Sequence, residues 1–232
     1  MVNKNYRINV IIPAKNEERT IGGILHTLRL DCSPQDIIVV VDHIKDRTIE
    51  IANQYGVKVM QGKGKGKGAA IKIACTQVTK DIVVLIDADG SHKVDDIPKI
   101  LQPIVDNKAD LVIASRMQGG SDEFSGSIKN RVHYIGNIAC SLLVNLLWRR
   151  RRQRITDCNN GFRAITTDVL QRLDLQEESF AFELEMTVKC IKRGYRIREV
   201  PSHEYRRQHG ESHLNSMMML PRFLICFIRN IF

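Results

Sequence analysis

IVVLIDADG, residues Ile82–Gly90, joins an unbroken apolar run to two acids spaced two residues apart and then a glycine. An apolar run of this length predicts a strand buried on both faces, as in a parallel sheet. Ligands of open α/β sheets bind just beyond the carboxyl ends of such strands. Because alternate residues of an extended chain point the same way, Asp87 and Asp89 are predicted to share one small volume.

Two neighbouring carboxylates repel each other, and a divalent cation removes that conflict. A hard ion that is held by one or two carboxylates, with diphosphate oxygens in its other positions, fits Mg²⁺ or Mn²⁺. Asp-Gly also marks ordinary turns, so the acid pair by itself leaves a simple polar turn open.

Strand-like and helical patterns alternate through the first half of the chain, which predicts an α/β fold with a mostly parallel central sheet flanked by helices. The expected strands are Arg7–Ile12, Asp36–Val41, Val57–Met60, Asp81–Ile86 and Asp110–Ala114. The expected helices between them are Glu17–Leu28, Arg47–Gln54, Ala69–Val78 and Asp95–Val105. The second half adds an apolar helix at Ile135–Trp148, short strands near Phe162–Ile165 and Tyr195–Val200, and a helix near Phe182–Lys192.

The 232 residues suit one large domain, or a domain with a small appendage. We expect a domain over residues 1–215 and an apolar, basic tail over residues 216–232. The net charge of +9 favours anionic partners such as phosphorylated substrates, acidic membranes or nucleic acid. The six cysteines are scattered without a C-x-x-C pair, which indicates reduced thiols in the cytoplasm rather than a zinc site. No apolar leader precedes the first expected strand.

Two basic stretches of the sequence are candidates for binding anionic ligands or surfaces. The loop G-K-G-K-G-K-G at residues 62–68 lacks the spacing of a P-loop, and Lys67 is its best candidate for approaching an anionic ligand, with a solvated loop as the alternative. The arginines that follow Trp148 come without a stacking platform or a recognition helix, which argues against nucleic acid. An apolar helix that ends in arginines suits an anionic membrane surface better, with a core or dimer helix as the alternative.

Taken in order, the motifs resemble family-two glycosyltransferases of the GT-A fold, in particular the branch similar to dolichol-phosphate mannosyltransferases. The resemblance covers Ile8 to about Leu214 and is carried by I-I-P-A-K-N-E-E, V-V-V-D, G-K-G-A-A, D-A-D-G-S, A-S-R, N-G-F-R-A-I, F-E-L-E-M, and E-V-P followed by Tyr205, Arg207 and G-E-S. It implies inverting transfer of a hexose from a nucleotide-diphosphate sugar (GDP-mannose or a UDP-sugar) to a polyprenyl (dolichyl) phosphate. It also implies amphipathic interfacial helices and a peripheral position on the cytoplasmic face of a membrane. A separate membrane-protein partner is left open.

The same resemblance assigns the residues of the site. It implies that Pro13, Glu17 and Asp42 line the nucleotide. The full set that we predict to line the nucleotide sugar is Pro13, Lys15, Glu17, Asp42, Lys67, Asp87, Ala88 and Asp89. The metal, Mg²⁺ or Mn²⁺, would rest on Asp87 and Asp89, with Ser91 open as a third ligand. The residues implied for catalysis are Asp89, Arg116, Arg131, Arg207 and Glu185, the last in an unassigned role.

Two other functions are compatible with parts of the pattern. A haloacid-dehalogenase-like phosphatase also uses an acid pair after an apolar strand, although its nucleophile follows the first strand and Asp87 follows the fourth. A non-catalytic basic module that binds RNA or a membrane fits the net positive charge of the chain.

If the chain is a transferase, its acceptor phosphate has a second pKa of about 6 and is largely dianionic at neutral pH. Such an acceptor needs no strong general base.

Overall fold

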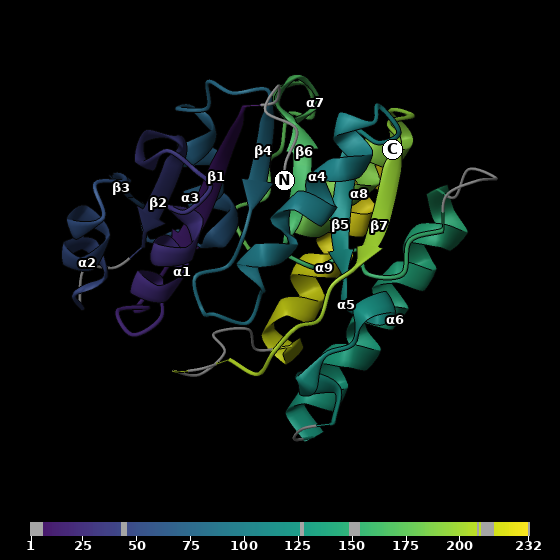
Figure 1. Ribbon diagram of the computed structural model, residues 1–232. Coiled ribbons are helices and arrows are strands. Elements are labelled where there is room, and N and C mark those ends of the chain that lie inside the picture. The colour runs from purple at the N-terminus through teal and green to yellow at the C-terminus, as the bar shows by residue number, and fades with distance from the viewer. Residues whose placement is uncertain are drawn as a thin grey trace.

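The computed structural model describes residues 7–42, 46–125, 128–148, 154–207, 209 and 216–231. Within these residues, one seven-stranded sheet has the order β3-β2-β1-β4-β6-β5-β7 (Figure 1). Its strands are β1 Ile8–Ala14, β2 Ile37–Val41, β3 Lys58–Gln61, β4 Ile82–Leu85, β5 Leu111–Ser115, β6 Arg163–Thr166 and β7 Ile197–Pro201. Only β6 among them runs antiparallel to its neighbours, so the expected mostly parallel sheet is confirmed.

Apolar residues of the strands alternate between two buried clusters, one on each face of the sheet. In β4, Val83 and Leu85 face one cluster, whereas Ile82 and Val84 face the other. All four are at most 2% exposed, as the apolar run predicted. Helices α1, α2 and α4 cover one face, and α3, α8 and α9 cover the other (Figure 1). Because both faces of β4 are covered, the acids that follow it, Asp87 and Asp89, lie beyond its carboxyl end.

The helices of the first half lie close to their expected positions: α1 Ile21–Leu28, α2 Thr48–Gln54, α3 Lys67–Cys75 and α4 Ile97–Val105. Helix α1 begins four residues after the expected Glu17. The intervening residues form a turn in which the Glu17 carbonyl accepts hydrogen bonds from the N–H groups of Thr20 and Ile21. Asn16, with φ 57°, adopts a left-handed backbone conformation just before this turn. Glu17 and Glu18 therefore lie between the end of β1 and the start of α1 and are not part of the helix.

The second half is dominated by helices: α5 Arg116–Gly119, α6 Ile128–Trp148, α7 Thr167–Arg172, α8 Phe182–Lys192 and α9 Ser216–Ile231. Helix α6 starts seven residues earlier than the expected Ile135. Helix α9 is partly built into the core, since Cys226 and Phe227 are buried and Phe227 stacks on Trp148 with ring centroids 5.8 Å apart. The division into residues 1–215 and 216–232 remains a prediction.

Candidate active site

Three acids gather beyond the carboxyl ends of β1 and β4. Asp87 and Asp89 follow β4, and Glu17 lies three residues beyond β1. Thr20 joins the two segments, because its Oγ1 donates to the Ala88 carbonyl at 2.6 Å and lies 3.2 Å from Glu17 Oε2. Since β1 and β4 are parallel neighbours, their ends meet at one edge of the sheet. The structure thus brings these acids together where ligands of open α/β sheets bind.

Asp87 is held by two basic side chains. Lys67 Nζ lies 2.5 Å from Asp87 Oδ1 and also 2.8 Å from Glu183 Oε1. His92 Nε2 lies 3.6 Å from Asp87 Oδ2. Burial acts to raise the pKa of Asp87, but Lys67 and His92 hold that pKa well below its usual value. The carboxylate of Asp87 is therefore ionised and paired with the Lys67 ammonium.

Asp89 is paired with Arg207, which also reaches Glu17. Arg207 Nε lies 3.2 Å from Asp89 Oδ2, and a terminal nitrogen of Arg207 lies 2.9 Å from Glu17 Oε1. The hydroxyl and N–H of Ser91 donate to the other oxygen of Asp89, at 2.6 and 3.0 Å. One guanidinium from the C-terminal part of the chain thus links acids from two strand ends.

This cluster has the composition that a divalent ion with a diphosphate requires. Four carboxylates (Glu17, Asp87, Asp89 and Glu183) surround the ammonium of Lys67 and the guanidinium of Arg207. No group of three or more His, Cys, Asp or Glu side chains arranged for a metal occurs in the part of the chain that the structure describes. Mg²⁺ is commonly bound by one or two carboxylates together with substrate phosphates, so Asp87 and Asp89 suffice. The donor set fits Mg²⁺ or Mn²⁺.

Gly161 keeps this cluster open. A Cβ at this position would lie 2.6 Å from Asp87 Oδ2 and 2.5 Å from Lys67 Nζ, closer than side chains pack. A side chain at residue 161 would therefore displace the Lys67 ammonium or the Asp87 carboxylate from its present position.

Asp42, at the end of β2, closes the Gly-Lys loop. Its carboxylate accepts hydrogen bonds from the N–H groups of Gly64, at 2.7 Å, and Gly66, at 3.2 Å. Pro13 lies within β1, and Lys15 is exposed just beyond it. The roles predicted for these three residues at the nucleotide remain predictions.

The family model for glycosyl transferase family 2 matches residues 9–177 of this chain. The chain belongs to glycosyl transferase family 2. The matched region contains Glu17, Lys67, Asp87 and Asp89, the part of the acid cluster that lies on the first four strand–helix units. The resemblance seen in the ordered motifs is confirmed, and the chain is a glycosyltransferase rather than a phosphatase or a non-catalytic binding module.

Curated relatives of this glycosyltransferase match most of its length. It is 29% identical to the dolichyl-phosphate hexose transferase of Haloferax volcanii over 206 residues, which cover 89% of this chain and 86% of that protein. It is 30% identical over 218 residues to the UDP-N-acetylglucosamine–dolichyl-phosphate N-acetylglucosaminyltransferase of Methanococcus voltae, covering 84% of each chain.

The fold is shared with a solved glycosyltransferase structure. The glucosyl-3-phosphoglycerate synthase of Mycobacterium tuberculosis, solved with Mn²⁺, UDP and phosphoglyceric acid, superposes with a TM-score of 0.74 at 21% identity. The match covers 98% of this chain and 79% of that chain. The predicted GT-A type of α/β fold is thereby confirmed.

Glu183 and His92 belong to the acid cluster of this glycosyltransferase, and the sequence alone assigned neither. The sequence pointed to Glu185 instead, but residues two apart on a helix face nearly opposite directions. Glu185 is buried against the N–H groups of Gln176 and Glu177 and pairs with Lys189 at 2.7 Å. The structure therefore places Glu183, and not Glu185, beside Lys67. The sequence signal, F-E-L-E-M, contains both acids and does not show which one faces the strand ends.

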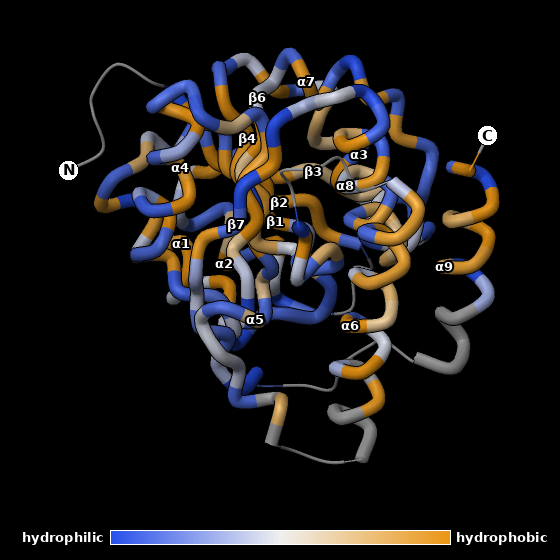
Figure 2. The backbone as a smooth tube through the Cα atoms, turned by 90° about the vertical axis from the view of Figure 1, so that its right-hand side faces the viewer, coloured by the Kyte–Doolittle hydropathy of each residue, from blue (hydrophilic) through white to orange (hydrophobic). Residues whose placement is uncertain are grey.

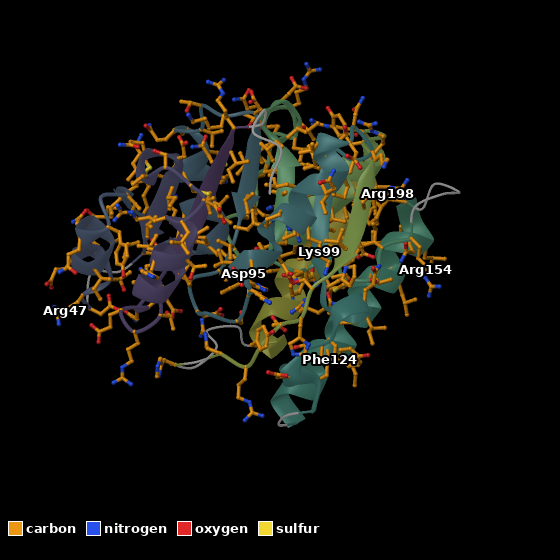
Figure 3. All side chains as sticks on the ribbon, viewed as in Figure 1. Arg47, Asp95, Lys99, Phe124, Arg154 and Arg198 are labelled. Atoms are coloured by element: carbon orange, nitrogen blue, oxygen red, sulfur yellow. The ribbon has the colours of Figure 1, made fainter. Side chains whose placement is uncertain are left out.

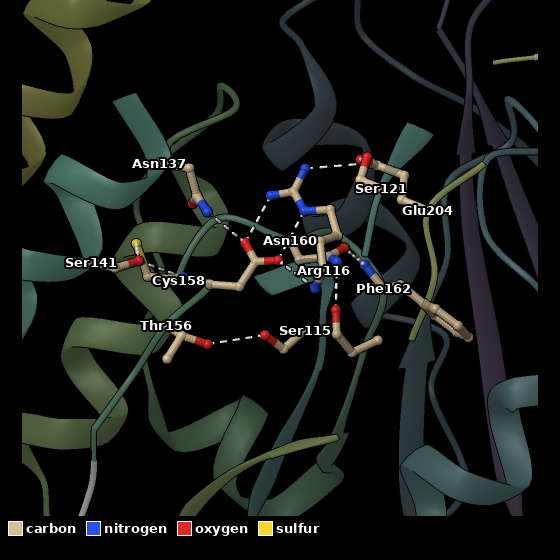
Figure 4. A network of polar contacts seen from close by, with 12 residues as sticks. Ser115, Arg116, Ser121, Asn137, Ser141, Thr156, Cys158, Asn160, Phe162 and Glu204 are labelled. Atoms are coloured by element: carbon tan, nitrogen blue, oxygen red, sulfur yellow. Dashed lines mark hydrogen bonds and ion pairs between the residues drawn. The ribbon is translucent and has the colours of Figure 1, made fainter. Parts of the chain in front are cut away.

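Arg116 lies in a buried polar network beside the site (Figure 4). Its guanidinium makes two hydrogen bonds to the Asp157 carboxylate, at 2.7 and 2.8 Å, and one at 3.3 Å to Glu204. Asn137 of α6 also donates to Asp157, at 2.9 Å. Two acids thus balance one guanidinium, and the network ties α6 to β5 and to the segment that leads to Arg207. The role predicted for Arg116 at a phosphate remains a prediction.

Some predicted features lie outside the described residues. The side chain of Arg131, on α6, is among them, as are the arginines at positions 149–152. Among the helices that the structure does describe, none combines the length and apolar character needed to cross a membrane.

Glu17 is expected to make the stability of this enzyme depend on pH. Burial, with a contribution from Asp89, raises the pKa of Glu17 from 4.5 to about 7 despite the opposing effect of Arg207. A raised pKa stabilises the folded state below pH 4.5, and this contribution is lost as pH rises through about 7. Between pH 5 and 8, wild type should lose roughly 2 kcal/mol of unfolding free energy relative to Glu17→Gln. Urea unfolding at several pH values measures the difference, and parallel curves for the two proteins would contradict it.

Proposed function

We propose that the chain transfers a hexose, with inversion, from a nucleotide-diphosphate sugar to a polyprenyl phosphate of the dolichyl type. The observation that carries the proposal is the cluster of Asp87, Asp89 and Glu17 with Lys67 and Arg207 at the strand ends. The names of the relatives support the acceptor, since two of them act on dolichyl phosphate. The proposal leaves the nucleotide base and the sugar of the donor open. One relative is named for a UDP-linked donor.

In this proposal Asp87 and Asp89 would hold Mg²⁺ or Mn²⁺, which would supply Lewis-acid stabilisation of the departing diphosphate when bound. The M. tuberculosis synthase, solved with Mn²⁺ and UDP, supports a divalent ion in this fold. Lys67 and Arg207 supply charge-assisted hydrogen bonds to phosphate oxygens. Ser91 orients Asp89 through its two hydrogen bonds. Because the acceptor phosphate is largely dianionic, positioning and electrostatics provide most of the rate.

A donor panel tests this function. Purified protein is given GDP-mannose, UDP-glucose or UDP-N-acetylglucosamine with polyprenyl phosphate in detergent and Mn²⁺ or Mg²⁺, and the lipid-linked sugar is separated and counted. We expect one donor to label the lipid in a metal-dependent reaction. A parallel series offers 3-phosphoglycerate, the acceptor named for the structural neighbour. Transfer to that acceptor, with none to the lipid, would overturn the proposed acceptor.

We also place the enzyme at a membrane surface. Helices α6 and α9 pack against each other and both contain many apolar residues (Figure 2), some of which are exposed. The exposed members include Ile135, Leu142, Leu146, Leu224, Ile225 and Ile228. Basic residues lie nearby, with Arg222 and Arg229 exposed on α9 and Arg154 beyond the end of α6 (Figure 3). An apolar face with basic residues suits an anionic lipid surface. The six cysteines, all described, are free thiols, in keeping with the cytoplasmic side.

The triple variant Leu224→Ser, Ile225→Ser, Ile228→Ser should bind lipid at least tenfold more weakly than wild type, because each lost apolar side chain removes about 1–2 kcal/mol of burial in the interface. Co-sedimentation with vesicles of phosphatidylcholine and phosphatidylserine measures the change. The control is Leu30→Ser, which alters a residue 74% exposed just after α1. Equal loss in the control, or none in the triple variant, would contradict a role for α9.

A further inference from the structure

Lys67 occupies a position beside Asp87 that a bound cation would also take. Its ammonium lies between Asp87 Oδ1, at 2.5 Å, and Glu183 Oε1, at 2.8 Å. The side chain of Lys67 is 13% exposed and that of Glu183 is 2% exposed. Asp87, at 26% exposed, is the partner that opens toward solvent. The ammonium thus has one fully enclosed partner and one that an incoming ligand can reach.

The backbone on both sides fixes this arrangement. Lys67 is the first residue of α3, and Gly66 before it has φ 115°, a conformation that favours glycine. The N–H of Ala69 donates to the carbonyl of Glu178 at 3.1 Å, which ties the start of α3 to the segment before α8. Because α8 carries Glu183, this contact sets the distance between Lys67 and Glu183.

We propose that Lys67 is an internal counter-ion that neutralises Asp87 until the donor binds, and that Glu183 is the positioning residue that keeps it there. When the donor arrives with its metal ion, the ammonium exchanges Asp87 for a diphosphate oxygen and stays paired with Glu183. The exchange is non-covalent, and the proton remains on Lys67. This inference rests on the proposed function only for the nature of the donor.

The exchange makes metal and nucleotide binding depend on each other. A metal ion that arrives alone has to separate the Lys67–Asp87 pair, and the displaced ammonium gains no new partner. A nucleoside diphosphate supplies that partner and at the same time adds ligands for the metal. Metal alone should therefore bind weakly, and removal of the Lys67 ammonium should strengthen its binding while weakening that of the nucleotide.

Binding of Mn²⁺ alone, measured by electron paramagnetic resonance of the free ion, tests the proposal without donor or acceptor. We expect Lys67→Met to bind Mn²⁺ about tenfold more tightly than wild type, the effect of losing one charge-assisted contact in a half-buried site. Removing a positive charge favours Mn²⁺ in any mechanism. The decisive protein is therefore the double variant Lys67→Met, Glu183→Gln, in which the net charge is unchanged. It also neutralises Glu183, the enclosed acid that the single variant leaves unpaired, whereas Asp87 is partly exposed and keeps its contact with His92 at 3.6 Å.

The double variant should retain most of the gain in Mn²⁺ affinity. Lys65→Met, which removes an exposed lysine paired with Glu178 at 3.7 Å, is the matched control and should bind Mn²⁺ like wild type. Without metal, UDP and GDP should bind the double variant about tenfold more weakly than wild type. Mn²⁺ affinity of the double variant within about twofold of wild type would overturn the proposal. If the Mn²⁺ affinity shifts as expected but no sugar nucleotide of the donor panel supports transfer, the counter-ion role stands and only the proposed function is overturned.

Discussion

Asp89→Asn should lower the rate of sugar transfer by about 10²–10³-fold, because it removes the charge that holds the metal and through it the leaving diphosphate. Asparagine has nearly the same shape, and its Oδ1 can still accept the two hydrogen bonds from Ser91. Its amide group would face Arg207, so the contact at 3.2 Å is lost as well. Initial rates at saturating donor and Mn²⁺ measure the effect, with circular dichroism as the check on folding.

The matched control for this variant is Asp95→Asn. Asp95 is 69% exposed and pairs only loosely with Lys93, at 4.0 Å. We expect its rate to stay within about twofold of wild type, since an exposed pair of this kind contributes little. Full activity of folded Asp89→Asn protein would remove this aspartate from the metal site.

Asp157→Ala should reduce the free energy of unfolding by about 3–5 kcal/mol, the cost of removing one partner of a buried ion pair. The Asp157 side chain is fully buried and accepts hydrogen bonds from the backbone and guanidinium of Arg116 and from Asn137. Alanine would leave the Arg116 guanidinium, itself only 20% exposed, with Glu204 as its acidic partner. Urea unfolding followed by circular dichroism at pH 7.5 measures the loss.

Asp168→Asn is the comparison for this stability prediction. Asp168 pairs with Arg172 at 2.8 Å, but both side chains are about two-thirds exposed. We expect a change of about 0–0.5 kcal/mol. For Asp157, burial acts to raise the pKa of the carboxyl group, but Arg116 and Asn137 together lower this pKa below its usual value. The contribution of Asp157 to the free energy of unfolding is therefore present above about pH 4 and is lost as the pH falls. If both variants lost similar amounts of unfolding free energy, the buried pair would contribute no more to stability than the exposed one.

The strands and the acid pair could be predicted because their signals are local. The apolar run before Asp87 marks β4, and strand–helix alternation marks a mostly parallel sheet. The approach of Lys67 to an anionic ligand remains a prediction, and its pairing with Glu183 was not predicted. That pairing joins α3 to α8, and the contact is set by packing between segments more than 100 residues apart. Periodicity within either helix contains no information about it.

Other contacts were beyond prediction for the same reason. Arg116 and Asp157 are 41 residues apart, and nothing in the motif A-S-R shows that two acids surround this guanidinium. Strand β6 was found, but its antiparallel direction follows from where the chain re-enters the sheet between β4 and β5. Likewise, nothing in the sequence of residues 216–232 shows that Cys226 and Phe227 join the buried cluster on one face of the sheet.

The sequence by itself determined the α/β fold, the family and the acids at the end of β4, because each depends on residues that are neighbours along the chain. The tertiary structure decided which charges meet: Lys67 with Asp87 and Glu183, Arg207 with Asp89 and Glu17, and Arg116 with Asp157. The physical reason is that an ion pair depends on distance and burial. Both are set by how strands and helices from separate parts of the chain pack at one edge of the sheet.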